Sequence, residues 1–106
     1  MMQNARITLH PSKQRMQVQV NGILLADSTC TLELHEHGYS PRHYFSREDV
    51  QMDLLTVSET TTYCPFKGRT VYFSLGESLD IAWSYVEPIE GMEPLAGRVA
   101  FYEEAC

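Results

Sequence analysis

The segment Cys64-Pro65-Phe66-Lys67-Gly68 places a thiol and an amine together where the flanking residues predict a turn between two strands. Projecting from a turn that proline stiffens, Lys67 could serve as a cation for a carboxylate or a phosphate. Cys64 could serve as a nucleophile, although a reactive thiol needs a base and the sequence identifies none beside it. The structural alternative is that Gly68 takes a positive φ, Cys64 is a small buried residue and Lys67 is solvated. Both interpretations are open on the sequence alone.

The run His35-Glu36-His37 offers either a pair of metal ligands or one inward-facing carboxylate. Residues two apart on a strand share a face, so both histidines could reach one metal ion, with Cys64 or Asp49 as a third ligand. The simpler interpretation places the histidines on the solvent face and the carboxylate inside, where it would need a partner such as Arg47 or Lys67. We favour this second interpretation. No metal site is therefore predicted, and Glu36 joins Lys67 and Cys64 as a candidate for catalysis.

The segment from Gly38 to Asp49 is the least regular part of the chain, and it is too polar and too interrupted for a strand. Long irregular loops on small β scaffolds often carry function, which makes Tyr44 and Arg47 candidates for ligand binding. The alternative is that Arg47 and Asp49 only fix the loop, by a salt bridge and a cap. Ser46 followed three residues later by an aspartate resembles a helix start, so at most one short helical turn is expected here.

Two aromatic residues, Trp83 and Tyr85, share one face of a predicted strand with Ile81. Core packing is the usual role of such a stripe. The functional alternative is an aromatic wall that stacks against a planar ligand. This alternative makes Trp83 and Tyr85 candidates for ligand binding beside Tyr44 and Lys67.

The composition is that of an ordinary globular protein. The 106 residues argue for a single domain over 1–106, with 43% hydrophobic and 21% charged residues. The formal net charge of −6 argues against binding to a nucleic acid polymer. No apolar run is long enough to span a membrane, and the N-terminal residues lack the apolar region of a secretory signal. A cytoplasmic protein with free thiols, no cofactor and no membrane partner is therefore expected.

The elements that must position these residues are strands, because alternating and β-branched runs recur and helical periodicity is nearly absent. The clearest element is a hairpin over residues 15–28, in which apolar residues alternate with glutamines and Asn21-Gly22 supplies a type I′ turn. Further strands are expected at 6–10, 30–36, 50–55, 60–66, 70–75, 80–88 and 97–104. About eight short, mostly antiparallel strands predict an all-β sandwich, barrel or folded-over sheet.

Six short motifs, taken in order, resemble those of the domain of unknown function 427 family. They are ADS at 26–28, HE at 35–36, YFSREDVQMDLL at 44–55, YCPFKG at 63–68, DIAWSY at 80–85 and GRVAFY at 97–102. The resemblance covers almost the whole chain and departs from the family pattern at Ser46, where proline is usual. It implies a small bacterial all-β protein, similar to the β-tent of Mss4-like and Yippee-like domains. The family also carries a nucleotidyltransferase label. Zinc-binding β-tent domains use paired CxxC motifs, which this chain lacks, so no structural zinc is implied.

These observations predict one concave face that forms a polar and aromatic pocket, lined by Glu36, Tyr44, Arg47, Lys67, Trp83 and Tyr85. Because Cys64 and Phe66 should share the core face of their strand, Lys67 should point the other way, toward Glu36 or the aromatic residues. The first functional hypothesis is binding of a small anionic or planar molecule. One alternative is an enzyme, either nucleotidyltransferase-like or using Lys67 or Cys64 in other chemistry. Another alternative is a protein-interaction domain, and a homodimer is compatible with the sequence.

Overall fold

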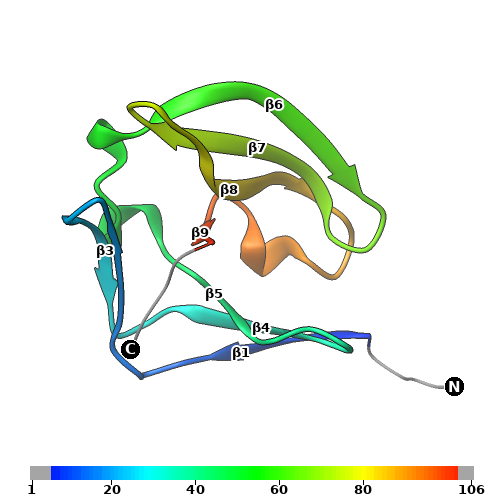
Figure 1. The fold of residues 1–106 in the computed structure, drawn as a ribbon. Coiled ribbons are helices and arrows are strands. Elements are labelled where there is room, and N and C mark those ends of the chain that lie inside the picture. Colours follow the sequence, from blue (N-terminus) through cyan, green and yellow to red (C-terminus); the bar gives the residue numbers. More distant parts are fainter. Residues whose placement is uncertain (1–5, 103–106) are drawn as a thin grey trace, which may run out of the picture.

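The computed structural model describes residues 6–102, and Figure 1 shows that this part of the chain is built from antiparallel strands. The strands are β1 (Ile7–Pro11), β2 (Met16–Val20), β3 (Ile23–Ser28), β4 (Leu32–Glu36), β5 (Arg42–Tyr44), β6 (Thr56–Cys64), β7 (Gly68–Leu75), β8 (Ser78–Pro88) and β9 (Val99–Phe101). Three 3-10 turns complete it: η1 (Arg47–Asp49), η2 (Met52–Leu54) and η3 (Glu93–Leu95). The predicted all-β class is confirmed. No helix within residues 6–102 is long and apolar enough to cross a membrane.

The strands form three sheets, with the orders β1-β4-β5, β2-β3 and β6-β7-β8-β9. In Figure 1 the four-stranded sheet arches over the three-stranded sheet, and the β2–β3 hairpin stands at one end. The two larger sheets are joined where Phe45 and Val99 exchange backbone hydrogen bonds of 2.8 and 2.9 Å. This junction holds β5 against β9. The side chains between the three-stranded and the four-stranded sheets therefore pack against both of them.

The hairpin over β2 and β3 follows the sequence pattern closely. Asn21 and Gly22 have φ values of 53° and 79°, the two positive values that a type I′ turn requires. Met16, Val18 and Val20 are buried, whereas Gln19 between them is exposed. The alternation therefore sends one face of the hairpin into the core, as predicted.

The core divides into two clusters. One lies around the hairpin and β9 and includes Val18, Leu25, Phe45 and Phe101, whose two rings meet edge to face with centroids 5.8 Å apart. Burying a side chain of this size contributes about 1.5–3 kcal/mol to stability. The second cluster lies between the two larger sheets and consists of Leu32, Leu34, Tyr44, Tyr85, Leu95 and Ala100. It forms the apolar floor beneath the pocket described below.

Two segments differ from the sequence prediction. Residues 38–49, predicted to be too polar for a strand, contain β5, which pairs with β4. Its polar residue His43 is buried with a hydrogen-bonding partner, because its Nδ1 is 2.7 Å from the hydroxyl of Thr31. Residues 50–55, predicted to be a strand, form turn η2, and only Val50 makes an isolated bridge, to Ala26. The described chain thus has a strand, β5, where none was predicted, a 3-10 turn where a strand was predicted, and three 3-10 turns instead of one.

Strand β6 is the outer strand of the four-stranded sheet, and most of its residues are exposed on both faces. Its register with β7 shifts between Val57 and Thr61, which marks a bulge. Within the bulge the backbone N–H of Thr60 donates to the hydroxyl of Ser58 at 2.9 Å. The bulge therefore interrupts the ladder of backbone groups in the middle of this edge.

Candidate functional site

A pocket of about 590 Å³ opens between the three-stranded and the four-stranded sheets. We call it the aromatic pocket, because its lining includes all six tyrosines and the single tryptophan of the chain. Its lining residues are Arg6, Leu34, Glu36, Tyr39, Ser40, Arg42, Tyr44, Tyr63, Cys64, Pro65, Phe66, Lys67, Tyr72, Trp83, Tyr85 and Tyr102. These residues come from β4, β5 and the segment between them, from β6, the β6–β7 turn, β7 and β8, and from the ends of β1 and β9. Figure 1 shows the β6–β7 turn and the β4–β5 connection on the same side of the molecule.

Lys67 and Glu36 form the main polar contact of the aromatic pocket. The Lys67 ammonium donates a hydrogen bond of 2.8 Å to Oε1 of Glu36. The two side chains are only 15% and 11% exposed, so the pair is largely withdrawn from water. The ammonium also lies 5.8 Å from the centre of the Tyr85 ring, within range of a cation–π attraction. The predicted contact between Lys67 and Glu36 is confirmed.

A second cation, Arg6, completes this end of the pocket. Its Nε lies 3.7 Å from Oε2 of Glu36, so each carboxylate oxygen faces one cation. The Arg6 guanidinium also covers the Phe66 ring at 4.2 Å. Phe66 is 46% exposed, and the prediction that it shares a buried core face with Cys64 is wrong. Its ring is partly covered by the Arg6 guanidinium instead of by the apolar core.

Gly68 explains how Lys67 reaches the pocket. The Lys67 N–H donates to the carbonyl of Cys64 at 3.1 Å and closes a tight turn, and Gly68 then takes a φ of 131°. A β-carbon at Gly68 would lie 2.3 Å from the carbonyl oxygen of Glu87 on the neighbouring strand. Only glycine allows β7 to start this close to β8. The turn and the close approach together fix the point from which Lys67 projects.

The floor of the aromatic pocket is a row of rings. The centroids of Tyr44 and Tyr85 are 6.1 Å apart, and those of Tyr44 and Trp83 are 6.5 Å apart with the planes nearly perpendicular. The indole N–H of Trp83 donates to the hydroxyl of Tyr44 at 3.2 Å. Burial raises the pKa of Tyr85 to about 12 and also raises the pKa of Tyr44. Both phenols are therefore neutral hydrogen-bonding groups at physiological pH.

The rim of the pocket is aromatic as well, although it is open to solvent. Tyr39, Tyr63 and Tyr102 are 68%, 66% and 59% exposed. Tyr102 packs against Trp83 with the ring centroids 4.5 Å apart. At this end Arg42 lies over the Trp83 ring at 5.3 Å and donates to the carbonyl of Phe101 at 2.6 Å. The pocket thus has a buried ring floor, an exposed ring rim and cations at both ends.

Arg47 is the predicted binding residue that the structure places elsewhere. It lies in η1, where its Nε donates to the carbonyl of Gly97 at 2.6 Å and its guanidinium lies 5.5 Å from the Phe73 ring centre. It does not line the aromatic pocket, and Glu36 is paired with Lys67 and Arg6 instead. The alternative interpretation of Arg47, that it fixes the loop, describes its contacts better. It does so through a backbone carbonyl, however, and not through the salt bridge that was predicted.

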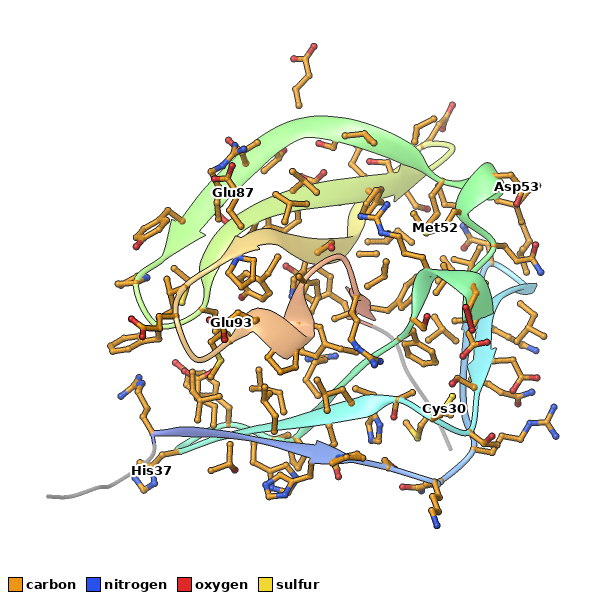
Figure 2. All side chains as sticks on the ribbon, turned by 180° about the vertical axis from the view of Figure 1, so that it is seen from behind. Cys30, His37, Met52, Asp53, Glu87 and Glu93 are labelled. Atoms are coloured by element: carbon orange, nitrogen blue, oxygen red, sulfur yellow. The ribbon has the colours of Figure 1, made fainter. Side chains whose placement is uncertain are left out.

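The histidine and aspartate candidates do not converge. His35 contacts Glu33 at 3.3 Å, and His37 is exposed. Figure 2 shows His37 and Cys30 at opposite ends of the β1–β4 pair, and Asp53 far from His37. Across residues 6–102, no group of three or more histidine, cysteine or acidic residues is placed to hold a metal ion. Asp49 and Asp53 lie in two separate 3-10 turns, η1 and η2.

Cys64 lines the pocket and is half buried against its floor. Among the described residues, no hydrogen bond or ion pair joins its sulfur to a histidine or a carboxylate. A thiol without a neighbouring base is a weak nucleophile at neutral pH. Its surroundings are those of a small apolar packing residue.

Sequence reasoning missed several lining residues: Arg6, Tyr39, Arg42, Tyr63, Phe66, Tyr72 and Tyr102. One signal was present in the composition. The chain has 6 tyrosines against 4 phenylalanines, and tyrosine carries a hydroxyl that needs a polar neighbour when it is buried. An excess of tyrosine over phenylalanine is therefore a hint that many rings lie at a wet surface and not in the core.

Comparison with known proteins places the chain in a family without adding a function. No curated protein matches it. A family model described as "Domain of unknown function (DUF427)" matches residues 8–106, which include all of the strands described above except the first residue of β1. The chain therefore belongs to the DUF427 family.

Proposed function

We propose that the protein binds a small, planar, anionic molecule in the aromatic pocket. The observation that carries the proposal is the gathering of all six tyrosines and the single tryptophan around one cavity that also holds Arg6, Arg42 and Lys67. Ring faces stack on planar molecules, and guanidinium and ammonium groups attract anions. The volume of about 590 Å³ lies within the range of small-molecule sites, about 300–1,000 Å³.

The charge of the pocket supports an anion in particular. The described part of its lining has three cations and one carboxylate, Glu36, whereas the whole chain has 8 basic and 14 acidic residues. Three of the eight basic side chains thus lie around one cavity of an acidic protein. A second and smaller cavity, of about 280 Å³, has the opposite character, since its charged lining residues are Asp27, Glu48 and Asp49. An anionic ligand is favoured at the first cavity and repelled at the second.

The exposed rim distinguishes a binding site from a plain core. Tyr39, Tyr63, Phe66 and Tyr102 remain 46–68% exposed around one opening. Exposed aromatic side chains grouped at a cavity mark interaction sites, whereas single exposed rings are common. A small-molecule site explains both the rim and the cavity beneath it. A protein-interaction surface would explain the rim alone.

The single tryptophan makes the proposal testable by NMR. Trp83 gives one indole N–H signal, so a titration of ¹⁵N-labelled protein with 2-naphthoate reports directly on the pocket. We expect this signal to shift in a saturable way. The variant Lys67→Met should weaken binding about tenfold or more, since a charge-assisted hydrogen bond contributes about 1.5–3 kcal/mol.

The chain offers a matched control, because its only other lysine is the exposed Lys13. Lys13→Met makes the same change in net charge away from the pocket and should leave binding unchanged. An indole signal that does not move, or equal weakening by both variants, would count against the proposed function.

A further inference from the structure

We infer that the aromatic pocket selects ligands with one negative charge, namely aromatic monocarboxylates, and that Glu36 sets this preference. The inference rests on the proposed function and narrows its ligand class. It comes from the balance of charges at the Lys67 end of the pocket, from the donors that remain there, and from the position of the nearest rings.

The Lys67 end carries two cations and one carboxylate. Oε1 of Glu36 is 2.8 Å from the Lys67 ammonium, and Oε2 is 3.7 Å from the Arg6 guanidinium. The group therefore has one net positive charge, and it lies partly out of water, with Lys67 and Glu36 only 15% and 11% exposed and Arg6 48% exposed. One further anionic charge would neutralise the group. A second would remain uncompensated beside buried rings, where an unpaired charge is costly.

Hydrogen-bond donors remain for one such anion. An ammonium has three N–H donors, and within the described chain Glu36 is the one acceptor of the Lys67 side chain. Arg6 approaches Glu36 through Nε, so that ion pair does not use its terminal amino groups. A ligand carboxylate has two oxygens and could accept from both cations at once. The Glu36 carboxylate is already held in this way, with one oxygen facing each cation.

The same end is poorly suited to a polyphosphate. Among residues 6–102, Glu36 is the only carboxylate in the lining, and two cations already engage it. Magnesium bound to a nucleoside triphosphate is usually held by one or two carboxylates that are free to coordinate it. Asp49 and Asp53 are outside the lining, in η1 and η2. The residues of the pocket therefore favour a carboxylate over a triphosphate.

The rings show where the body of the ligand would lie. The Tyr85 ring lies 5.8 Å from the Lys67 ammonium, and Tyr44 and Trp83 continue the row of rings from Tyr85. A molecule whose carboxylate meets Lys67 and Arg6 would place an attached aromatic ring beside Tyr85 and Tyr44. An acid group bonded directly to a flat ring system fits this sequence of contacts.

Three naphthalene probes with the same ring test the inference: 2-naphthoate, neutral 2-naphthamide and 2-naphthyl phosphate, which is close to dianionic above neutral pH. Dissociation constants are measured from the Trp83 indole signal at constant ionic strength. We expect the carboxylate to bind at least about fivefold more tightly than either of the others, a factor equivalent to about 1 kcal/mol. Glu36→Gln adds one positive charge to the Lys67 end of the pocket. This variant should therefore bind the phosphate more tightly than the carboxylate, by a similar factor. Glu87→Gln, which removes a carboxylate outside the pocket, should keep the wild-type order.

The outcomes separate this inference from the proposed function. If none of the probes shifts the indole signal, the proposed function fails. If the amide binds as tightly as the carboxylate, the pocket binds planar molecules but the charge preference is refuted. If the phosphate binds the wild-type protein at least as tightly as the carboxylate does, monoanion selection is refuted. The wild-type series decides these points even if Glu36→Gln does not fold.

Discussion

Two ion pairs stand on either side of Gly68 and differ mainly in their surroundings. Lys67 contacts Glu36 at 2.8 Å, and Arg69 contacts Glu87 at 2.9 Å. The side chains of the first pair are 15% and 11% exposed inside the aromatic pocket. Those of the second pair are 49% and 67% exposed on the four-stranded sheet. Equal distances therefore do not imply equal energies. The buried pair gives up hydration and depends on its partner, and the exposed pair can exchange its partner for water.

The comparison also explains why neighbouring cations of one turn have different roles. Residues two apart on a regular strand would share a face, but Gly68 between them has a φ of 131° and interrupts the alternation. Lys67 enters the pocket, and Arg69 pairs across β7 and β8 with Glu87, which Figure 2 shows on the four-stranded sheet. The backbone conformation of Gly68 thus directs Lys67 into the pocket and Arg69 to the exposed surface.

Replacing that glycine should break both pairs and produce the largest effect. Gly68→Ala puts a β-carbon 2.3 Å from the Glu87 carbonyl oxygen at a backbone angle that alanine rarely adopts. We expect a loss of more than about 3 kcal/mol in the free energy of unfolding, measured in urea. Gly76→Ala is the control, because Gly76 also has a positive φ, of 55°, but nothing lies within 4 Å of its β-carbon position. That variant should lose only about 1 kcal/mol. Similar losses in both variants would show that the close approach to Glu87 is unimportant.

Removing the buried cation should have the next largest effect. Lys67→Met keeps the apolar stem but leaves Glu36 with Arg6 alone, at 3.7 Å. We expect a loss of about 2–3 kcal/mol in urea unfolding, less than the 3–5 kcal/mol typical of a fully buried pair, because Arg6 remains. Lys13→Met should not change the unfolding midpoint measurably. A stable Lys67→Met variant would mean that Glu36 is satisfied by water and that the ammonium is held ready for a ligand.

Double-mutant cycles sharpen the comparison by isolating each pair. We expect a coupling free energy of about 1–2 kcal/mol between Lys67 and Glu36, because both side chains are shielded from solvent. The same cycle on Arg69 and Glu87 should give a clearly smaller coupling, because water competes for both of these exposed side chains. Equal couplings in the two cycles would show that distance and not burial determines the interaction.

The smallest effect is expected from the exposed pair in response to pH. The Arg69 guanidinium hydrogen bonds to Glu87 and lowers the pKa of this carboxyl from its ordinary value of 4.5. A carboxyl whose folded-state pKa is lowered stabilises the protein above its unfolded pKa, and this contribution is lost as the pH falls through the folded value. The thermal midpoints of the wild type and Arg69→Met should therefore differ slightly at neutral pH and low salt and converge in acid. A gap that persists below the folded pKa would point to packing by the arginine stem.

The sequence predicted those parts of the molecule that depend on local pattern. The hairpin at residues 15–28 follows from alternation and from Asn21-Gly22, both of which act within a few residues. The contact between Lys67 and Glu36 was predictable because an inward-facing carboxylate needs a cation and few were available. Tyr44, Trp83 and Tyr85 meet as expected, since strand periodicity assigned the last two to a single face.

The remaining differences come from contacts that are distant in the sequence. Arg47 leaves the pocket because a carbonyl fifty residues later, at Gly97, accepts its hydrogen bond. Strand β5 forms because β4 offers it an edge and the hydroxyl of Thr31 satisfies its histidine. Phe66 stays outside the core because the guanidinium of Arg6, from the N-terminal part of the chain, lies over its ring. None of these partners lies within the few residues over which a strand or helix pattern can be recognised.

The bulge in β6 bears on how the protein behaves at high concentration. An outer strand with exposed Val57 and Tyr63 and without lysine or proline resembles a segment that could recruit a second chain by sheet extension. At its centre, however, the amide of Thr60 is already bonded to the hydroxyl of Ser58, so an incoming strand finds no straight row of donors there. By accepting this hydrogen bond, the serine hydroxyl removes one backbone donor from the edge. It thus helps to protect the edge against aggregation without a charged side chain at every exposed position of the strand.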